Sequence, residues 1–197
     1  MNDKKCSHCN KEMPSMQGGI ITEIEDKQVH RCGACWNKFV SKEMGIDFKT
    51  IELKPITLTD CSGNQHTFHF LTHIVPSGLA FEAHEIVDGE RTGYRFEVLG
   101  PHDCNQQDLI LDLYEKIKRG LGLKYLEHGE LGKQIKDMSV VGRIEWDDEY
   151  GGEIPELCID GERITWHEFG KMLMTFEGWQ FKLEMLDRTD EIDRCPE

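Results

Sequence analysis

Two Cys-x-x-Cys pairs near the start of the chain restrict its possible folds more than any other feature. The first pair is CSHC at residues 6–9, and the second is CGAC at residues 32–35. Four cysteines in this pattern can form two disulfides, a dithiol redox centre or one tetrahedral metal site. Which of these forms determines the fold of the first quarter of the chain.

The residues around the second pair favour the metal site. Two short β-prone runs, IITEI and QVHRC, are joined by a polar turn and predict a hairpin. After Cys35 the sequence WNKFVSKEMG predicts a helix that ends at Gly45. This order of cysteine turn, hairpin and cysteine turn at a helix start resembles a treble-clef or zinc-ribbon module over about residues 4–45.

We therefore expect one structural zinc ion bound by all four cysteines of these pairs, Cys6, Cys9, Cys32 and Cys35. The helix start after the second pair favours thiolate over thiol. A thioredoxin-type redox centre needs one Cys-x-x-Cys after a strand, and two disulfides conflict with a reducing compartment. Catalysis at this site is not expected, because four protein ligands leave no open position on the ion.

Charge is unevenly distributed over the 197 residues, whose net charge is −14. Residues 1–45 hold seven Lys/Arg and six Asp/Glu (+1), residues 46–144 hold 11 and 15 (−4), and residues 145–197 hold five and 16 (−11). Binding to phosphate backbones needs clustered positive charge, so duplex nucleic acid is disfavoured as a partner. No run approaches the ~20 apolar residues that cross a bilayer, and the charged start lacks a leader core, so we expect a cytoplasmic protein without membrane association.

From residue 50 the pattern predicts an α+β fold, a mostly antiparallel sheet with two covering helices. The runs HTFHFLTHI, LAFEAHEIV and YRFEVLG are typical of a meander. One helix is expected over residues 105–120, and another should follow the capping box Thr165–Glu168. After Gly178, apolar and polar residues alternate over residues 179–185, which predicts a half-buried strand.

The domain division expected from these patterns is a zinc-binding module at residues 1–45 and an α+β domain at residues 50–190. The larger domain can be divided further into residues 50–135 and 139–190. The stretches HTFHF, GYRFEVLG, DGERITWHEFGKMLMTFEGWQFKLEM and DRTDEI resemble an uncharacterised bacterial family without an assigned activity. That resemblance implies a bacterial protein and supplies no catalytic residues.

A second candidate site comes from the nine histidines of the chain. A hairpin that turns at Pro76 and Ser77 would place its phenylalanines on a core face and gather polar side chains on the other face. Those side chains are His69, His84, His73 and Glu82. They predict either a second metal or acid–base site, or simply a polar outer face with hydrogen-bonded histidines. A longer loop would shift the register and scatter them.

The function that these features favour is a non-enzymatic, zinc-stabilised adaptor or protein-binding protein of the bacterial cytoplasm. One alternative is a metal-dependent enzyme that uses the histidine-rich face. Another is a weak nucleic-acid binder whose N-terminal module contacts phosphates through Lys4, Lys5, Lys11 and Lys38. No P-loop, G-x-S-x-G, H-E-x-x-H or dinucleotide-binding glycine pattern occurs, so binding is favoured over catalysis. The sequence does not indicate an oligomeric state.

Overall fold

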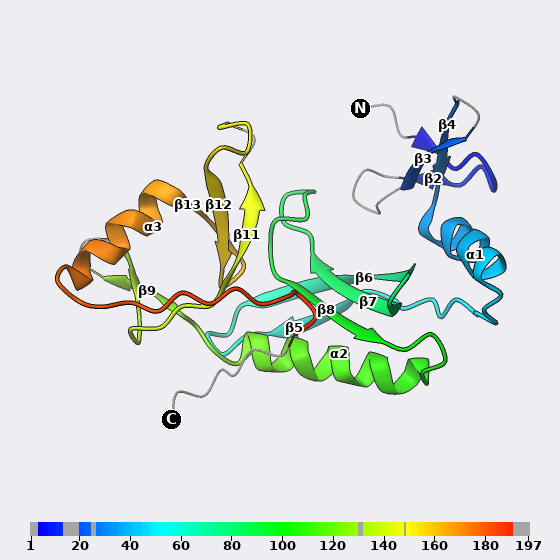
Figure 1. Cartoon of the computed structure of the whole chain (residues 1–197). Helices are drawn as coiled ribbons and strands as arrows, with labels where there is room; N and C mark the ends of the chain where they lie inside the picture. Colours follow the sequence, from blue (N-terminus) through cyan, green and yellow to red (C-terminus); the bar gives the residue numbers. More distant parts are fainter. Residues whose placement is uncertain (1–3, 14–19, 25–26, 130–131, 148, 191–197) are drawn as a thin grey trace.

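The computed structural model describes residues 4–13, 20–24, 27–129, 132–147 and 149–190. Within these ranges every paired strand is antiparallel, and the strands form five small sheets accompanied by three α-helices. Figure 1 shows three parts that follow one another along the chain: a small N-terminal module, a central sheet with a long helix, and a C-terminal unit. The expectation of a mixed, mostly antiparallel protein is confirmed.

The N-terminal module is built from short hairpins that lead into a helix. Its elements are β1 (Lys4–Lys5), β2 (Glu12–Met13), β3 (Ile20–Ile24), β4 (Lys27–Arg31) and α1 (Gly33–Met44). Strand β1 pairs with β2, and β3 pairs with β4. Gly45 ends α1 in the left-handed conformation (φ 67°), as the sequence predicts, and its N–H points back to the carbonyl of Lys42.

The central part is a four-stranded meander covered by the longest helix. It comprises β5 (Ile56–Thr59), β6 (Gln65–Val75), β7 (Gly78–Glu85), β8 (Arg95–Gly100) and α2 (Gln106–Leu121), with the strands in that order. The β6–β7 register pairs His69 with His84, which confirms the predicted hairpin. The Asn105 side chain caps α2 by accepting from the N–H of Gln107. The helix runs one residue past Gly120, because the N–H of Gly122 still reaches helical carbonyls.

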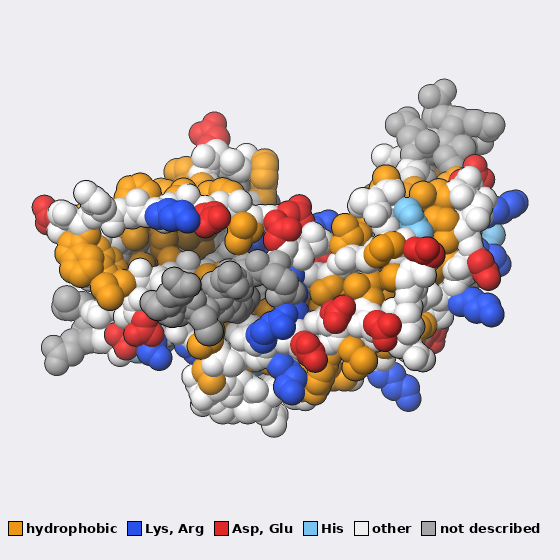
Figure 2. All heavy atoms as spheres, turned by 60° about the horizontal axis from the view of Figure 1, so that its bottom comes forward, with side chains coloured by type: hydrophobic (Ala, Val, Ile, Leu, Met, Phe, Trp, Pro, Cys, Tyr) orange, Lys and Arg blue, Asp and Glu red, His pale blue; other side chains and the backbone are white. Residues whose placement is uncertain are grey.

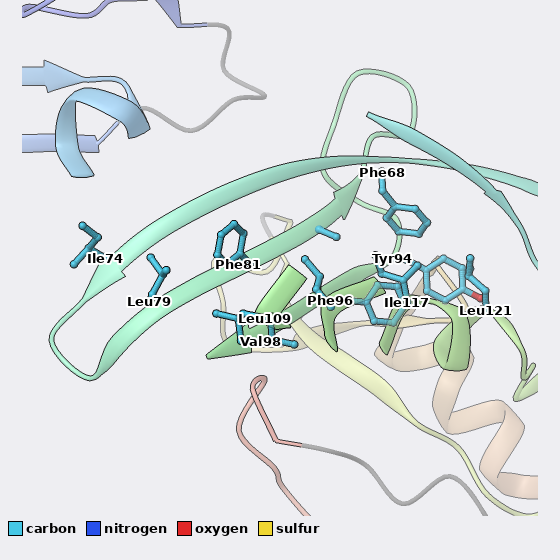
Figure 3. Close-up of a cluster of buried hydrophobic side chains, with 12 residues drawn as sticks. Phe68, Ile74, Leu79, Phe81, Tyr94, Phe96, Val98, Leu109, Ile117 and Leu121 are labelled. Atoms are coloured by element: carbon cyan, nitrogen blue, oxygen red, sulfur yellow. The ribbon is translucent and has the colours of Figure 1, made fainter. Parts of the chain in front are cut away.

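The core of this part lies between α2 and one face of the sheet (Figure 3). Phe68 and Phe81 are fully buried, and Leu113 and Ile117 of α2 are at most 1% exposed. These side chains recur at helical spacing on α2 and at alternate positions on the strands. The core face expected from the alternation is therefore buried, although β7 is buried on its other face as well.

Helix α1 docks the N-terminal module on the sheet by an unusual contact. Strand β5 pairs with β6 only up to Phe68, so beyond that point this edge of β6 has no neighbouring strand in the part of the chain that the structure describes. The buried Asn37 occupies this edge: its amide donates to the carbonyl of Thr72 (2.6 Å) and accepts from the N–H of Ile74 (3.2 Å). The Asn37 side chain thus makes the backbone hydrogen bonds that a neighbouring strand would otherwise make at this edge.

The C-terminal unit has its own core and its own helix. Its elements are β9 (Leu126–Gly129), β10 (Gly132–Ile135), β11 (Gly142–Trp146), β12 (Pro155–Ile159), β13 (Glu162–Thr165), α3 (Trp166–Leu173) and a 3-10 turn, η2 (Met174–Phe176). The β12–β13 turn has positive φ at Asp160 and Gly161, and the capping box between Thr165 and Glu168 is present, as predicted. None of the helices of the described residues has the length and apolarity to cross a membrane.

Two details of the expected fold are wrong. The two helices do not cover a single sheet, because α2 packs on β7 and β8 whereas α3 packs on β10, β12 and β13, around separate clusters of buried residues. Residues 179–185 do not form a half-buried strand: their apolar side chains are exposed, Phe181 to 89%. A strand needs a hydrogen-bonded neighbour, and the described part of this chain offers this segment none.

Candidate metal centre

The four cysteines of the two pairs meet beside the first turn of α1. Their Sγ atoms all lie within 4.8 Å of one another, and the Cys9 and Cys32 Sγ atoms are 3.8 Å apart. A tetrahedral ion with metal–sulfur bonds of about 2.3 Å holds its sulfurs about 3.8 Å apart, so this donor set fits such an ion. Among the described residues, no other group of three or more Cys, His, Asp or Glu side chains comes this close together.

Backbone hydrogen bonds shape the first cysteine turn and tie it to the hairpin. The N–H of Asn10 donates to the carbonyl of Cys6 (2.9 Å), and Asn10 itself has a positive φ of 58°. The N–H of Ser7 donates to the carbonyl of His30 (2.8 Å), while the Ser7 hydroxyl accepts from the N–H of His30 (3.3 Å). Strand β4 thereby positions the second cysteine pair, which begins at Cys32, next to the first cysteine pair.

The electrostatics of the cluster require a cation if all four sulfurs are to be thiolates. Burial disfavours the thiolate of Cys6, but backbone N–H groups, first that of Cys32 at 3.3 Å, lower its pKa to about 6. Burial and the adjacent thiols raise the pKa of Cys35 and Cys32 above the ordinary value. A divalent cation at the centre reverses this repulsion and deprotonates its ligands. The seven cysteines within the described ranges are all free thiols, so the cluster holds no disulfide.

The histidine-rich face predicted from the hairpin exists, but it is organised around a carboxylate. The His69 and His84 rings stack with centroids 6.1 Å apart, and His84 Nδ1 lies 3.4 Å from Glu82 Oε1. The other oxygen of Glu82 pairs with Arg95 Nη2 at 2.5 Å. An arginine and a histidine thus compete with any cation for this carboxylate, and the use of His69, His84, His73 and Glu82 as a metal or acid–base site stays a prediction.

This face is largely buried, and burial sets the charge states of its groups. Glu82 and His84 are 3% and 2% exposed. Burial opposes ionisation of Glu82, yet His84 and Arg95 lower its pKa to about 2, so the carboxylate is charged at neutral pH. Burial lowers the pKa of both His69 and His73 and favours their neutral rings. A buried charged carboxylate that is paired with an arginine and contacted by a histidine is typical of a structural ion-pair network.

A second buried polar network joins the central part to the C-terminal unit, and the sequence analysis missed it. His66 lies between two carboxylates, with Nδ1 2.7 Å from Glu85 Oε1 and Nε2 3.2 Å from Asp60 Oδ2. Lys124 Nζ lies 2.9 Å from the same Asp60 oxygen and donates to the Tyr94 hydroxyl at 3.0 Å. The residues come from five separate places in the sequence, which is why periodicity did not group them.

The carboxylates of this network are held by many donors of the chain itself. The Oδ1 atom of Asp60 accepts from the N–H groups of Ser62 and Asn64, and the pKa of Asp60 lies well below its usual range, since Lys124 and these donors outweigh burial. Asp160 accepts from the N–H groups that follow Lys124. The motif DCSGN did carry a signal for the Asp60 turn, because aspartate before small polar residues commonly bonds the backbone two residues on. The network therefore connects the central part of the fold to the C-terminal unit.

Comparison with known proteins divides the chain after α2. One family model, described as Domain of unknown function (DUF7686), matches residues 49–122, and a second, described as Domain of unknown function (DUF7713), matches residues 123–190. No curated protein and no solved structure matches the chain. The boundary between the two matched regions lies next to Lys124, the residue that ties them together through Asp60.

Proposed function

We propose that this chain is a non-enzymatic adaptor: a zinc-stabilised N-terminal module and a central sheet that together carry a protein-binding C-terminal unit. The observation that carries the proposal is the distribution of exposed apolar side chains. Of the 21 large hydrophobic side chains that are exposed among the described residues, eight lie within residues 138–174 of the C-terminal unit, and five more lie within residues 179–186, which follow it. An excess of exposed apolar surface on one unit is typical of a protein interaction site.

The surface proposed for binding involves β11, α3 and the turns next to them, and we call it the C-terminal apolar face. Figure 2 shows hydrophobic side chains over the lobe that this unit forms. Half of its exposed members are aromatic, the residue class that is enriched at the energetic centres of protein interfaces. Its exposed members are Ile144, Trp146, Tyr150, Trp166, Leu173 and Met174. Since residues 145–197 carry a net charge of −11, the partner that fits is a protein with a basic rim around an apolar site.

The role proposed for the four cysteines is structural, and zinc is the metal proposed for them. A closed set of four thiolates favours zinc over harder ions such as magnesium and leaves no site for a substrate. Two cysteine turns around a hairpin, with a helix beginning at the second turn, support a treble-clef-like arrangement. Reduced thiols suit a reducing compartment, and together with the resemblance of residues 50–190 they support the proposal of an adaptor of the bacterial cytoplasm.

The proposed binding role is tested by capture of proteins from the native host with variants of the apolar face. Trp146→Glu and Trp166→Glu replace side chains that are 65% and 49% exposed, so neither should unfold the protein. We expect each variant to bind its specific partner at least about tenfold more weakly, because it lacks an aromatic anchor of the interface. Leu111→Glu on α2 is the matched control, because Leu111 is 60% exposed outside the C-terminal unit. Equal capture by all variants would refute this face as the binding site.

Two further measurements separate the adaptor from the alternatives. Elemental analysis of the purified chain should find one zinc per chain, whereas a second bound metal would favour an enzyme built on the histidine-rich face. Duplex DNA should bind with no sub-micromolar affinity at physiological salt, because the negative charge of the body opposes phosphate backbones. Tight binding under those conditions would favour a nucleic-acid role for the N-terminal module.

A further inference from the structure

We infer that residues 181–185 form an antiparallel strand pair with the same segment of a second copy of this chain, with the two-fold axis at Leu183. The inference starts from the sequence pattern of a half-buried strand, which the fold of one chain leaves exposed. It does not depend on the proposed adaptor role, and purified protein alone is sufficient to test it.

The segment is fixed at both of its ends. At the start, the Phe176 and Trp179 rings pack edge to face with centroids 5.7 Å apart. At the far end, the buried Lys116 of α2 donates through Nζ to the carbonyls of residues 188, 189 and 190 at 2.9–3.4 Å. Arg188 also pairs with Glu97 of β8 at 2.9 Å. Figure 1 shows the segment running from α3 across the molecule to α2 between these two attachments.

Between these attachments the segment has no partner within the described part of the chain. No backbone hydrogen bond among the described residues involves residues 180–186. Its four alternating apolar side chains are 63% to 89% exposed: Trp179, Phe181, Leu183 and Met185. An extended chain that is held at both ends and free in between is already ordered for pairing, so little conformational entropy is lost when a strand adds to it.

The charges of the segment select a second copy in antiparallel orientation. With Leu183 on the two-fold axis, Lys182 of each copy lies opposite Glu184 of the other, and Phe181 lies opposite Met185. Two opposite-charge pairs and two apolar pairs result, whereas parallel in-register pairing would place like charges opposite each other. Within one chain Lys182 and Glu184 already lie 3.1 Å apart, but they are 84% and 61% exposed and are free to exchange partners.

The dimer should be weak and reversible. Five residues from each copy make an interface at the small end of the range, and a two-stranded ribbon alone is marginally stable in water. We therefore expect a dissociation constant in the micromolar range. An interface of this isologous type closes on itself and does not lead to fibres.

Sedimentation of the purified full-length chain over low to high micromolar concentrations tests the inference. The parent should dimerise, and Lys182→Glu and Glu184→Lys should each weaken the dimer about tenfold, since each creates two like-charge pairs. The double swap, Lys182→Glu with Glu184→Lys, should restore the parent affinity, because the opposite-charge pairs reappear. These positions are exposed, so folding is not at risk, and Leu111→Glu should leave the dimer unchanged.

Three results would overturn the inference. The first is a parent protein that stays monomeric over the whole concentration range. The second is a dimer that neither single charge change weakens, which would place the contact elsewhere on the molecule. The third is a double swap that fails to restore a dimer lost in the single variants.

Discussion

On the histidine-rich face, the neighbours of Glu82 keep its carboxylate charged. Its carboxylate is buried between His84 and Arg95, and its pKa falls from the ordinary value of 4.5 to about 2. A carboxyl with a lowered folded-state pKa stabilises the fold above its unfolded pKa and loses that contribution as the pH falls toward the folded value. The window for this loss is therefore from about pH 5 down to about pH 2.

We predict that Glu82→Gln lowers the free energy of unfolding by on the order of 2 kcal/mol at pH 7, because Arg95 loses its counter-charge. The difference between variant and parent should shrink as the pH is lowered through the window from 5 to 2. Urea unfolding at several pH values measures both effects. Glu115→Gln, at an exposed position on α2, is the control and should differ little from the parent. A difference that is constant with pH would contradict the assigned ion pair.

Cys32 is the residue through which the metal cluster and α1 are joined, since it supplies a ligand and stands at the N-cap of the helix. The module of about 40 residues buries too little apolar surface to fold alone, so metal binding supplies the missing free energy. We predict that Cys32→Ser releases the metal and lowers amide protection over residues 4–45. Native mass spectrometry and amide exchange measure the two effects, with the exposed Cys61→Ser as control. Retained stoichiometric metal, or an apo module as protected as the parent, would argue against a structural metal.

At the level of elements, the sequence predicted those features that depend on neighbouring residues, namely the register of a hairpin and the caps of helices. The β6–β7 register follows from alternation and turn position alone, and the caps at Asn105 and Thr165 follow from side chains that bond the nearest N–H groups. The strand expected over residues 179–185 has the same kind of pattern, yet it is unpaired. Alternation reports which side chains suit a sheet, but pairing depends on a free edge elsewhere in the fold, and no local pattern encodes that edge.

Helix α1 shows the reverse case, in which a tertiary contact came from a residue that the sequence did not single out. Asn37 is 1% exposed and satisfies two backbone groups on the open edge of β6. We predict that Asn37→Ala lowers stability by about 2 kcal/mol, because it leaves two backbone groups without partners. Amide exchange should show the loss at Ile74, while the metal content stays unchanged. The adjacent exposed Lys38→Ala is the control, and protection at Ile74 equal to that of the parent would refute the contact.

At the scale of the whole molecule, the chain is three small units joined by polar contacts and, at α1, also by Val40 packing against the central core. Asn37 connects the first unit to the second, and Lys124 connects the second to the third through Asp60 and Tyr94. The sequence predicted a module at residues 1–45 and a domain at residues 50–190 that can be divided further, but it did not reveal the connections. A connection made by residues 60, 66, 85, 94 and 124 has no period and depends on how the units meet. Buried polar contacts of this kind specify one relative placement where apolar packing alone would allow several.

The connection through Lys124 should decide whether the second and third units unfold together. Lys124→Met keeps the length of the side chain but leaves the buried carboxylate of Asp60 without its ammonium partner, at a cost of about 3 kcal/mol. We predict that residues 123–190 then lose amide protection before residues 49–122, so that one unfolding transition becomes two. Calorimetry and amide exchange measure this, with Lys118→Met, at an exposed position on α2, as the control. A single transition that is lowered equally in both regions would mean that apolar contacts couple the units and that the Asp60–Lys124 pair only adds stability to them.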